Sequence, residues 1–218
     1  MTAELVDPSP RPAAAEGRAY RAQAGEGDLL RDELLDATEA LLVAKGSMAQ
    51  VSLREVARTV GVSATSIYLH FADKDELLIA VCQRRFQAFS SMLRAARAQH
   101  EQPVAQLRAC GTAYVRFGLE HPEQYKVLFG GIPLELALER LEPDELVGLQ
   151  ALEEMASIVH AGVTAGDFRP VDPFQTALSL WAMVHGLVGV ITHGLDKPID
   201  TDRLVEGSLD LLLVGLQT

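Results

Sequence analysis

The sequence predicts an all-α protein with a small amino-terminal unit and a larger carboxy-terminal one. Strand-like alternation of apolar and polar residues is nowhere convincing along its 218 residues. Helix-start signals recur instead, as serine or aspartate caps and as prolines at first helical positions. A chain of this length with 48% hydrophobic residues can bury a sizeable core. We expect about nine helices in two domains, at residues 28–75 and 76–218, after an arm at residues 1–27.

The arm is rich in Ala, Pro, Gly and Glu and contains hardly any large apolar side chains. Such a segment cannot bury enough apolar surface to offset the entropy of ordering, so we predict that it is disordered. Its arginines, Arg11, Arg18 and Arg21, are either solvated charges or part of an arm that reaches the minor groove of DNA.

Residues 52–71 read as two short helices joined by a glycine turn. Ser52 and Glu55 have the spacing of a capping box, which predicts a helix start. An apolar stripe follows, and Gly61 comes after the last turn, where a left-handed residue closes a helix without steric cost. Ser63 can then cap a second helix at residues 64–69.

Two helices joined in this way form the helix-turn-helix unit, whose second helix enters the major groove of DNA. Short polar, phosphate-donating and basic side chains are therefore predicted to contact DNA: Ser52, Arg54, Ser63, Thr65, Ser66, Tyr68, His70 and Lys74. In the helical period, Ile67 and Phe71 point away from these residues, towards a hydrophobic support. The alternative is an ordinary helical hairpin in which Tyr68 and His70 are half-buried packing residues.

A long helix is predicted to begin at the cap-like pair of Asp73 and Glu76 and to run to about residue 99. Such a rigid element can carry displacement from a distant pocket to the hairpin. Prolines mark four further helix starts, at Pro103, Pro122, Pro143 and Pro173. Links are expected at residue 121 and at residues 130–133, 166–170 and 194–200.

The last two helices, at residues 173–193 and 201–216, carry more apolar surface than a lone surface helix should show. They predict a homodimer in which both helices form a four-helix bundle across a two-fold axis. A two-fold protein reads near-palindromic double-stranded DNA. The apolar run at residues 178–191 falls short of the ~20 residues of a membrane span, so we interpret it as a core helix and expect no membrane partner.

Aromatic and methionine side chains line most small-molecule sites, which suggests a cavity in the second domain. The candidates are Tyr114, Phe117, Phe129, Met155, Trp181 and His185. Because no charged residue is obvious among them, the expected small-molecule effector is largely apolar and uncharged, with His185 as its hydrogen-bond partner. Alternatively, Trp181 and His185 are core residues, with the histidine bonded to a backbone carbonyl.

The formal net charge of −11 at first argues against a polyanionic partner. Its distribution changes that conclusion. Residues 47–74 contain three basic and two acidic residues, so this window carries +1 and the rest of the chain carries −12. The acidic remainder repels DNA from every other face, and high affinity should need two subunits.

Cys82 and Cys110 have no neighbouring Cys or His at metal-ligand spacing. Two buried thiols in a reduced cytoplasm fit better than a redox sensor. The amino terminus lacks the basic-then-apolar order of a signal peptide. The sequence has no Ser-His-Asp ordering and no histidine paired with a plausible nucleophile at helical spacing. It also has no set of ligands at metal-binding spacing and no glycine-rich phosphate loop. We therefore expect no enzyme, no metal and no cofactor.

From residue 31 to residue 81 the chain resembles the amino-terminal domain of the TetR family of bacterial transcriptional regulators. An opening helix at residues 31–45 and Gly46 precede the hairpin, and an aromatic-x-His-Phe pattern with a following lysine and leucine pair is specific to the family. Leu42, and Ser47 with Met48, depart from the usual aromatics and affect core packing. The Trp-His-Gly set of Trp181, His185 and Gly186 resembles one group of TetR carboxy-terminal domains.

The resemblance implies a homodimeric, all-helical repressor or activator whose carboxy-terminal half binds a small molecule and thereby alters DNA affinity. We expect a repressor that its ligand releases from the operator. The competing interpretation is a helical small-molecule-binding or carrier protein whose hairpin is only structural.

Overall fold

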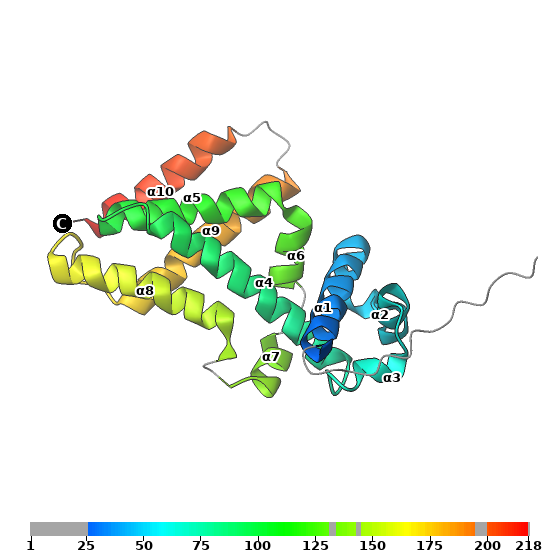
Figure 1. Ribbon diagram of the computed structural model, residues 1–218. Coiled ribbons are helices and arrows are strands. Elements are labelled where there is room, and N and C mark those ends of the chain that lie inside the picture. Colours follow the sequence, from blue (N-terminus) through cyan, green and yellow to red (C-terminus); the bar gives the residue numbers. More distant parts are fainter. Residues whose placement is uncertain (1–25, 131–133, 143–144, 195–199, 218) are drawn as a thin grey trace, which may run out of the picture.

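The computed structural model describes residues 26–130, 134–142, 145–194 and 200–217, and these residues form helices and connecting turns with no strand (Figure 1). This confirms the predicted all-α class. The predicted disordered arm lies mainly outside the described residues. Ten α-helices are present in the described part: α1 (Glu26–Lys45), α2 (Leu53–Val60), α3 (Ala64–Ile67), α4 (Lys74–Arg97), α5 (Pro103–Glu120), α6 (Pro122–Gly130), α7 (Leu134–Arg140), α8 (Val147–Ala165), α9 (Pro173–His193) and α10 (Thr201–Leu216).

Helices α1, α2 and α3 and the first turns of α4 form a small unit, the head, on one side of the molecule (Figure 1). Its core is a cluster of buried apolar side chains that includes Leu34, Val56, Ile67, Phe71 and Leu77. Ile67 and Phe71 are almost fully buried, which confirms their predicted supporting role. The guanidinium of Arg31 lies over the Phe71 ring at 5.2 Å from its centroid.

Local caps set the ends of the head helices. The Ser52 hydroxyl accepts a hydrogen bond from the Glu55 N–H at 3.3 Å, as predicted. The Glu55 carboxylate, however, pairs with Lys45 of α1 instead of closing the capping box, because a cation lies within its reach. Gly61 adopts the left-handed conformation with φ of 84°. The Ser63 hydroxyl accepts from the Ser66 N–H at 3.1 Å and so caps α3 as predicted.

Two helix bounds differ from the predictions. Helix α1 begins at Glu26, five residues early and inside the segment assigned to the arm, because acidic residues such as Asp28 favour a helix amino terminus. Helix α3 ends at Ile67 and not at residue 69. The chain tightens there, since the N–H groups of Tyr68, Leu69 and His70 each bond to the carbonyl three residues back.

Helix α4 crosses from the head into the rest of the molecule. Its Leu77 and Val81 belong to the head core, whereas Phe89 and Leu93 belong to the second core. Asp73 caps it by accepting from the Glu76 N–H at 2.9 Å, and the Glu76 carboxylate accepts from the Ala72 N–H. The predicted domain boundary at residues 75 and 76 therefore falls within a helix that serves both cores.

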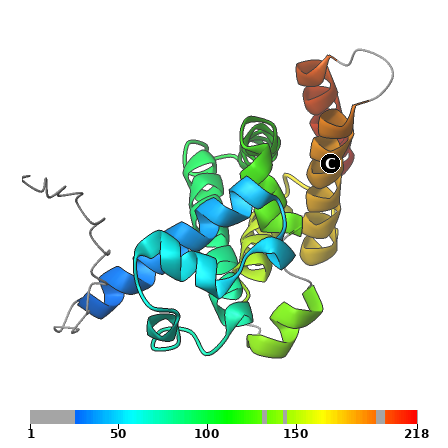
Figure 2. The ribbon, with the colours of Figure 1, turned by 90° about the vertical axis from the view of Figure 1, so that its right-hand side faces the viewer.

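In the second domain, α5 packs between α4 on one side and α9 with α10 on the other (Figure 2). Helix α8 packs against α9, α5 and α4. Helix starts at Pro103, Pro122 and Pro173 match the predictions. The predicted start at Pro143 lies outside the described residues, and the helix that follows begins at Val147. Helix α7 was not predicted, because its seven residues are too short for a clear apolar period.

Helix α9 is covered on one side and open on the other. Its buried residues face α8 and α5: Ala177, Leu180, Val184, Leu187 and Val188. Among the described helices it alone is long and apolar enough to cross a membrane by length and composition. Core helices of soluble proteins meet the same test, and α9 packs against three other helices of its own chain.

Candidate functional site

The turn that follows Ser63 presents its side chains to solvent. We call residues 65–70 the reading turn. Thr65 is exposed, and Tyr68 and Leu69 are 57% and 80% exposed. His70 is half-buried beside the first turn of α1 at Gly27. Because Ile67 alone among these six residues is buried, the reading turn stands on the head core with its other side chains available to a partner.

The remaining predicted DNA-contact residues lie around this turn. Ser52 and Ser63 are exposed at the amino-terminal ends of α2 and α3, so their N–H groups and hydroxyls lie at the head surface. The Ser66 hydroxyl lies 2.9 Å from the Ser63 hydroxyl, which orients both. Arg54 is exposed on α2, and Lys74 opens α4. In the described part of the chain, neither of these two cations forms an ion pair.

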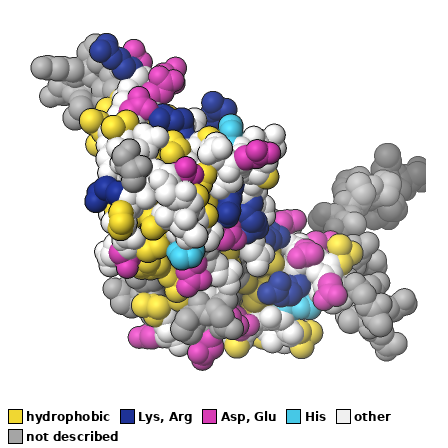
Figure 3. Space-filling model, turned by 90° about the vertical axis from the view of Figure 1, so that its left-hand side faces the viewer, with side chains coloured by type: hydrophobic (Ala, Val, Ile, Leu, Met, Phe, Trp, Pro, Cys, Tyr) yellow, Lys and Arg dark blue, Asp and Glu magenta, His cyan; other side chains and the backbone are white. Residues whose placement is uncertain are grey.

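An ion pair joins the start of α4 to α7. Asp73 contacts Arg140 through Oδ2 at 3.0 Å, while its Oδ1 caps α4. The Glu76 N–H, followed by Arg140, holds the pKa of the Asp73 carboxyl below its ordinary value of 3.8. Elsewhere, basic and acidic side chains are interspersed, as the face in Figure 3 shows. On the head, Arg54 and Lys74 lie near the exposed side chains of Tyr68, Ser52 and Ser63, a combination of basic, aromatic and hydroxyl groups that suits contact with phosphates.

A second candidate site is an apolar cavity of about 320 Å³ where α4, α6, α7, α8 and α9 meet. Thirteen residues line it: Ile79, Cys82, Gln83, Phe86, Leu128, Phe129, Ala137, Leu141, Leu146, Val147, Gly148, Leu149 and Trp181. None of these carries a formal charge. The Gln83 amide is occupied, since it donates to the Glu145 carbonyl at 2.5 Å and accepts from the Val147 N–H at 3.4 Å.

The structure divides the six residues predicted to contact a ligand. Phe129 and Trp181 line the apolar cavity, and Met155 lines a smaller pocket farther along α8. Tyr114 and Phe117 lie in the core next to the cavity, and the His185 ring packs against Phe129 and Trp181. The lining residues of α4, α7 and α8 were not predicted, since all except Gln83 are ordinary apolar or small residues on helices. The exposed Leu69 of the reading turn was not predicted as a site residue either.

Two tyrosines hold the His185 ring. Its Nδ1 lies 2.6 Å from the Tyr125 hydroxyl and 3.0 Å from the Tyr114 hydroxyl. The imidazole stacks on Tyr125 and on Trp181, with ring centroids at 5.5 and 5.1 Å. The partners are hydroxyl groups and not the backbone carbonyl considered above. Burial raises the pKa of both tyrosines, so their hydroxyls stay protonated and can donate to Nδ1.

This histidine should make stability depend on pH. Burial lowers the pKa of His185 below its ordinary value of 6.5, so the folded state favours the neutral ring. The unfolded chain then binds more protons than the folded one as the pH falls below 6.5, and the free energy of unfolding should decrease. Urea unfolding of the wild type and of His185→Gln at pH 7.5 and 5 measures this. The decrease should be smaller in the variant, and equal decreases would contradict the assignment.

Both cysteines are free and buried. Burial raises the pKa of Cys82 to about 12 and that of Cys110 to about 11, so both thiols stay protonated. Because the thiolate is the reactive form, this favours the structural role expected from the sequence over redox sensing.

The fold and the head together define a helix-turn-helix protein with a separate helical domain that contains a cavity. Comparison with known families supports this description in both parts of the chain. Residues 34–81 match the model described as bacterial regulatory proteins of the tetR family. Residues 107–212 match the tetracyclin repressor-like C-terminal domain. The chain belongs to the TetR family of DNA-binding transcriptional regulators.

Solved structures share the whole fold. A protein with unknown function from Rhodococcus sp. RHA1 is 27% identical with a TM-score of 0.75, covering 93% of this chain and 100% of that one. A TetR family protein from Vibrio parahaemolyticus is 21% identical with a TM-score of 0.68, covering 86% and 98%. AibR, in complex with isovaleryl coenzyme A and operator DNA, is 18% identical with a TM-score of 0.63, covering 84% and 97%.

Proposed function

We propose that this protein is a cytoplasmic, homodimeric repressor that binds a near-palindromic operator and leaves it when a small, largely apolar ligand enters the carboxy-terminal domain. The observation that carries the DNA-binding part is the exposure of the reading turn on a buried hydrophobic support. Its polar groups and those around it are the proposed contacts: Ser52, Arg54, Ser63, Thr65, Ser66, Tyr68, His70 and Lys74.

The helices α9 and α10 support the homodimer. Their outer faces expose large apolar side chains: Phe174, Leu178, Val190, Leu211 and Val214. On α9 the exposed positions recur every four residues and include the small residues Ala182 and Gly186. Figure 2 shows α9 and α10 together on one side of the domain. A second copy that covers this face buries the apolar side chains and presents two reading turns about one axis.

The apolar cavity supports the ligand part. Its volume falls at the lower end of ligand sites in proteins, and its lining is apolar and aromatic with few polar groups. Phe129 and Trp181 line it directly, and Tyr114 and His185 support these two rings. The similar protein AibR was solved with both isovaleryl coenzyme A and operator DNA, so a protein of this fold can bind a small molecule and DNA. The uncharged, mainly apolar lining of the cavity in this chain favours a ligand of largely apolar character.

Release from DNA requires that ligand and operator favour different arrangements of the same dimer. The head is tied to α4 by ion pairs from Arg84 to Asp36 at 2.7 Å and from Arg85 to Glu39. Helix α4 also lines the cavity, so a shift of α4 moves the head with it. Converting a mostly bound population into a mostly free one needs roughly 5 kcal/mol of ligand preference for the second arrangement.

Retardation of DNA fragments from the protein's own genomic neighbourhood tests the proposal. The purified protein should retard a fragment upstream of its own gene at low salt, and retardation should weaken steeply as salt rises. Sequencing the fragments that the protein enriches from the whole genome then gives the operator. Failure to bind any neighbouring fragment at low salt would favour a ligand carrier whose hairpin is structural.

A further inference from the structure

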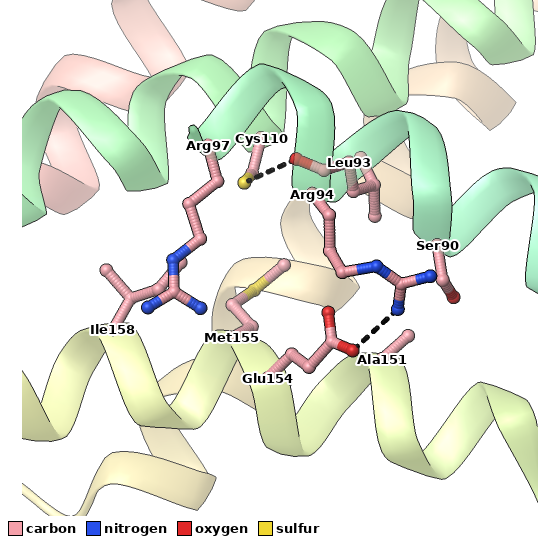
Figure 4. A pocket seen from close by; sticks show the side chains of 9 residues that line it. All are labelled: Ser90, Leu93, Arg94, Arg97, Cys110, Ala151, Glu154, Met155 and Ile158. Atoms are coloured by element: carbon pink, nitrogen blue, oxygen red, sulfur yellow. Dashed lines mark hydrogen bonds and ion pairs between the residues drawn. The ribbon is translucent and has the colours of Figure 1, made fainter. Parts of the chain in front are cut away.

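A small pocket between α4 and α8 combines two arginines with an apolar floor (Figure 4). We call it the arginine pocket. Arg94 and Arg97 extend from α4 towards α8, and Glu154 and Met155 lie between them. Leu93 and Ile158 are buried beneath. The arginine pocket therefore contains two guanidinium groups and one carboxylate, which leaves a positive charge there in a chain whose net charge is −11.

The two arginines differ in their partners. Arg94 donates to the Glu154 carboxylate at 2.7 Å and to the Ser91 hydroxyl at 2.9 Å. Arg97 is partly buried, and its hydrogen bond within the described chain is a long one of 3.4 Å to the Ser157 hydroxyl. A partly buried cation without an anionic partner is costly, so Arg97 is the group that a ligand anion would satisfy.

Ser90, one helical turn before Arg94 on α4, adds a second unsatisfied group at the other end of the arginine pocket from Arg97 (Figure 4). It is 2% exposed, lines the arginine pocket, and its hydroxyl has no hydrogen-bond partner among the described residues. Buried hydroxyls are nearly always bonded in folded proteins. The pocket itself is small, at about 20 Å³, which suits a compact charged group rather than a whole ligand.

The arginine pocket and the apolar cavity lie along the same two helices. Phe86 lines the cavity and Ser90 the pocket, one helical turn apart on α4. On α8, Gly148 lines the cavity and Ala151 the pocket. From Phe86 to Arg94 the rise along α4 is about 12 Å, the length of roughly ten carbons joined by bonds of about 1.5 Å.

We propose that the apolar cavity and the arginine pocket together bind a long aliphatic anion, with its chain in the cavity and its carboxylate or phosphate at Arg94 and Arg97. This proposal rests on the ligand-sensing function proposed above and replaces an uncharged ligand by an amphiphilic one. The chain buries apolar surface against the cavity wall, and the anion pairs with Arg97. Glu154 competes with the ligand for Arg94, so it sets the strength of the anion site.

Fluorescence of Trp181 provides the test, because it is the single tryptophan of the chain and lines the apolar cavity. Dodecanoate and dodecyl phosphate, at concentrations below micelle formation, should change the emission saturably. Dodecanol, with the same chain and no charge, should bind at least about tenfold more weakly. Hexanoate should bind at least about 100-fold more weakly, since each buried CH₂ contributes about fourfold. The tighter of the two twelve-carbon anions shows whether the site suits a free acid or a phosphate-bearing lipid.

Two substitutions should act in opposite directions. Arg97→Gln should weaken dodecanoate binding about tenfold and leave dodecanol binding within about twofold. Glu154→Gln should tighten dodecanoate binding, because it frees Arg94. Arg116→Gln, which removes the same charge from an exposed side chain of α5, is the matched control and should change neither. Circular dichroism melting of each variant checks that folding is intact.

Equal binding of dodecanol and dodecanoate to the wild type would overturn the anion site while leaving an apolar ligand possible. An unchanged dodecanoate affinity in Arg97→Gln would also overturn it, as would the lack of any binding by the twelve-carbon probes. Retardation of the operator fragment by the same preparation is a separate measurement. If the wild-type protein does not retard the fragment, that result counts against the proposed regulator and not against the proposed anion site.

Discussion

Replacing Tyr68 and Lys74 together with alanine should lower operator affinity at least about 1000-fold. Each residue is expected to donate to one phosphate in each subunit, which makes four hydrogen bonds per dimer at about 1.5 kcal/mol each. Tyr68 is 57% exposed and Lys74 forms no ion pair within the described residues, so both are available. Neither belongs to the buried head core, and the fold should persist.

Fluorescence anisotropy of labelled operator at a series of KCl concentrations measures this effect. The slope of log affinity against log salt should become shallower by about 2, since each dimer loses two lysine contacts with phosphate. Arg116→Ala removes a cation from α5, away from the head, and should change affinity by no more than about twofold. If the double variant bound with wild-type affinity and slope, the reading turn would not be the DNA-binding surface.

Substituting Gly186 with glutamate should convert the dimer into monomers and lower operator affinity at least about 100-fold. A Cβ built at Gly186 meets no atom within 4 Å in its own subunit, so the fold of one chain accommodates the new side chain. Across a two-fold axis the same position would bring two unpaired carboxylates into an apolar contact, which is costly. DNA affinity falls because one subunit reads only half of the operator.

Sedimentation equilibrium at micromolar concentration, combined with anisotropy on operator DNA, measures both effects. Ala95→Glu introduces the same charge at an exposed position of α4 and should leave the dimer and its DNA affinity intact. Circular dichroism should show the Gly186 variant fully helical. A stable dimer in that variant would place the interface on another face and remove α9 from it.

Local interactions explain why much of the head could be predicted. Ser52, Ser63 and Asp73 each accept a hydrogen bond from the N–H three residues later. Gly61 supplies a conformation that other residues rarely adopt. Each of these signals lies within four residues of its partner, so the printed sequence contains both members. A local prediction was wrong where a residue distant in sequence made the contact. The Glu55 carboxylate, predicted to close the capping box, forms an ion pair with Lys45 instead.

In the second domain, the helix starts were predictable from prolines, but the lining of the cavity was not. Tyr114, Phe117 and His185 were predicted to line a cavity together with Phe129 and Trp181, and in the structure only the latter two line it. An apolar or aromatic residue on a helix looks the same in sequence whether it faces the core or an opening. Which of the two it faces depends on how helices far apart in the chain pack together.

By itself, the sequence determined the helical class, the capped hairpin of the head and the apolar excess of the last two helices, because caps, turns and periodicity are short-range properties. Only the tertiary structure decided that α4 serves two cores, that α7 pairs with Asp73, and that Arg97 lies beside Met155 of α8. These contacts join residues as much as 67 positions apart, and their geometry follows from the packing of whole helices.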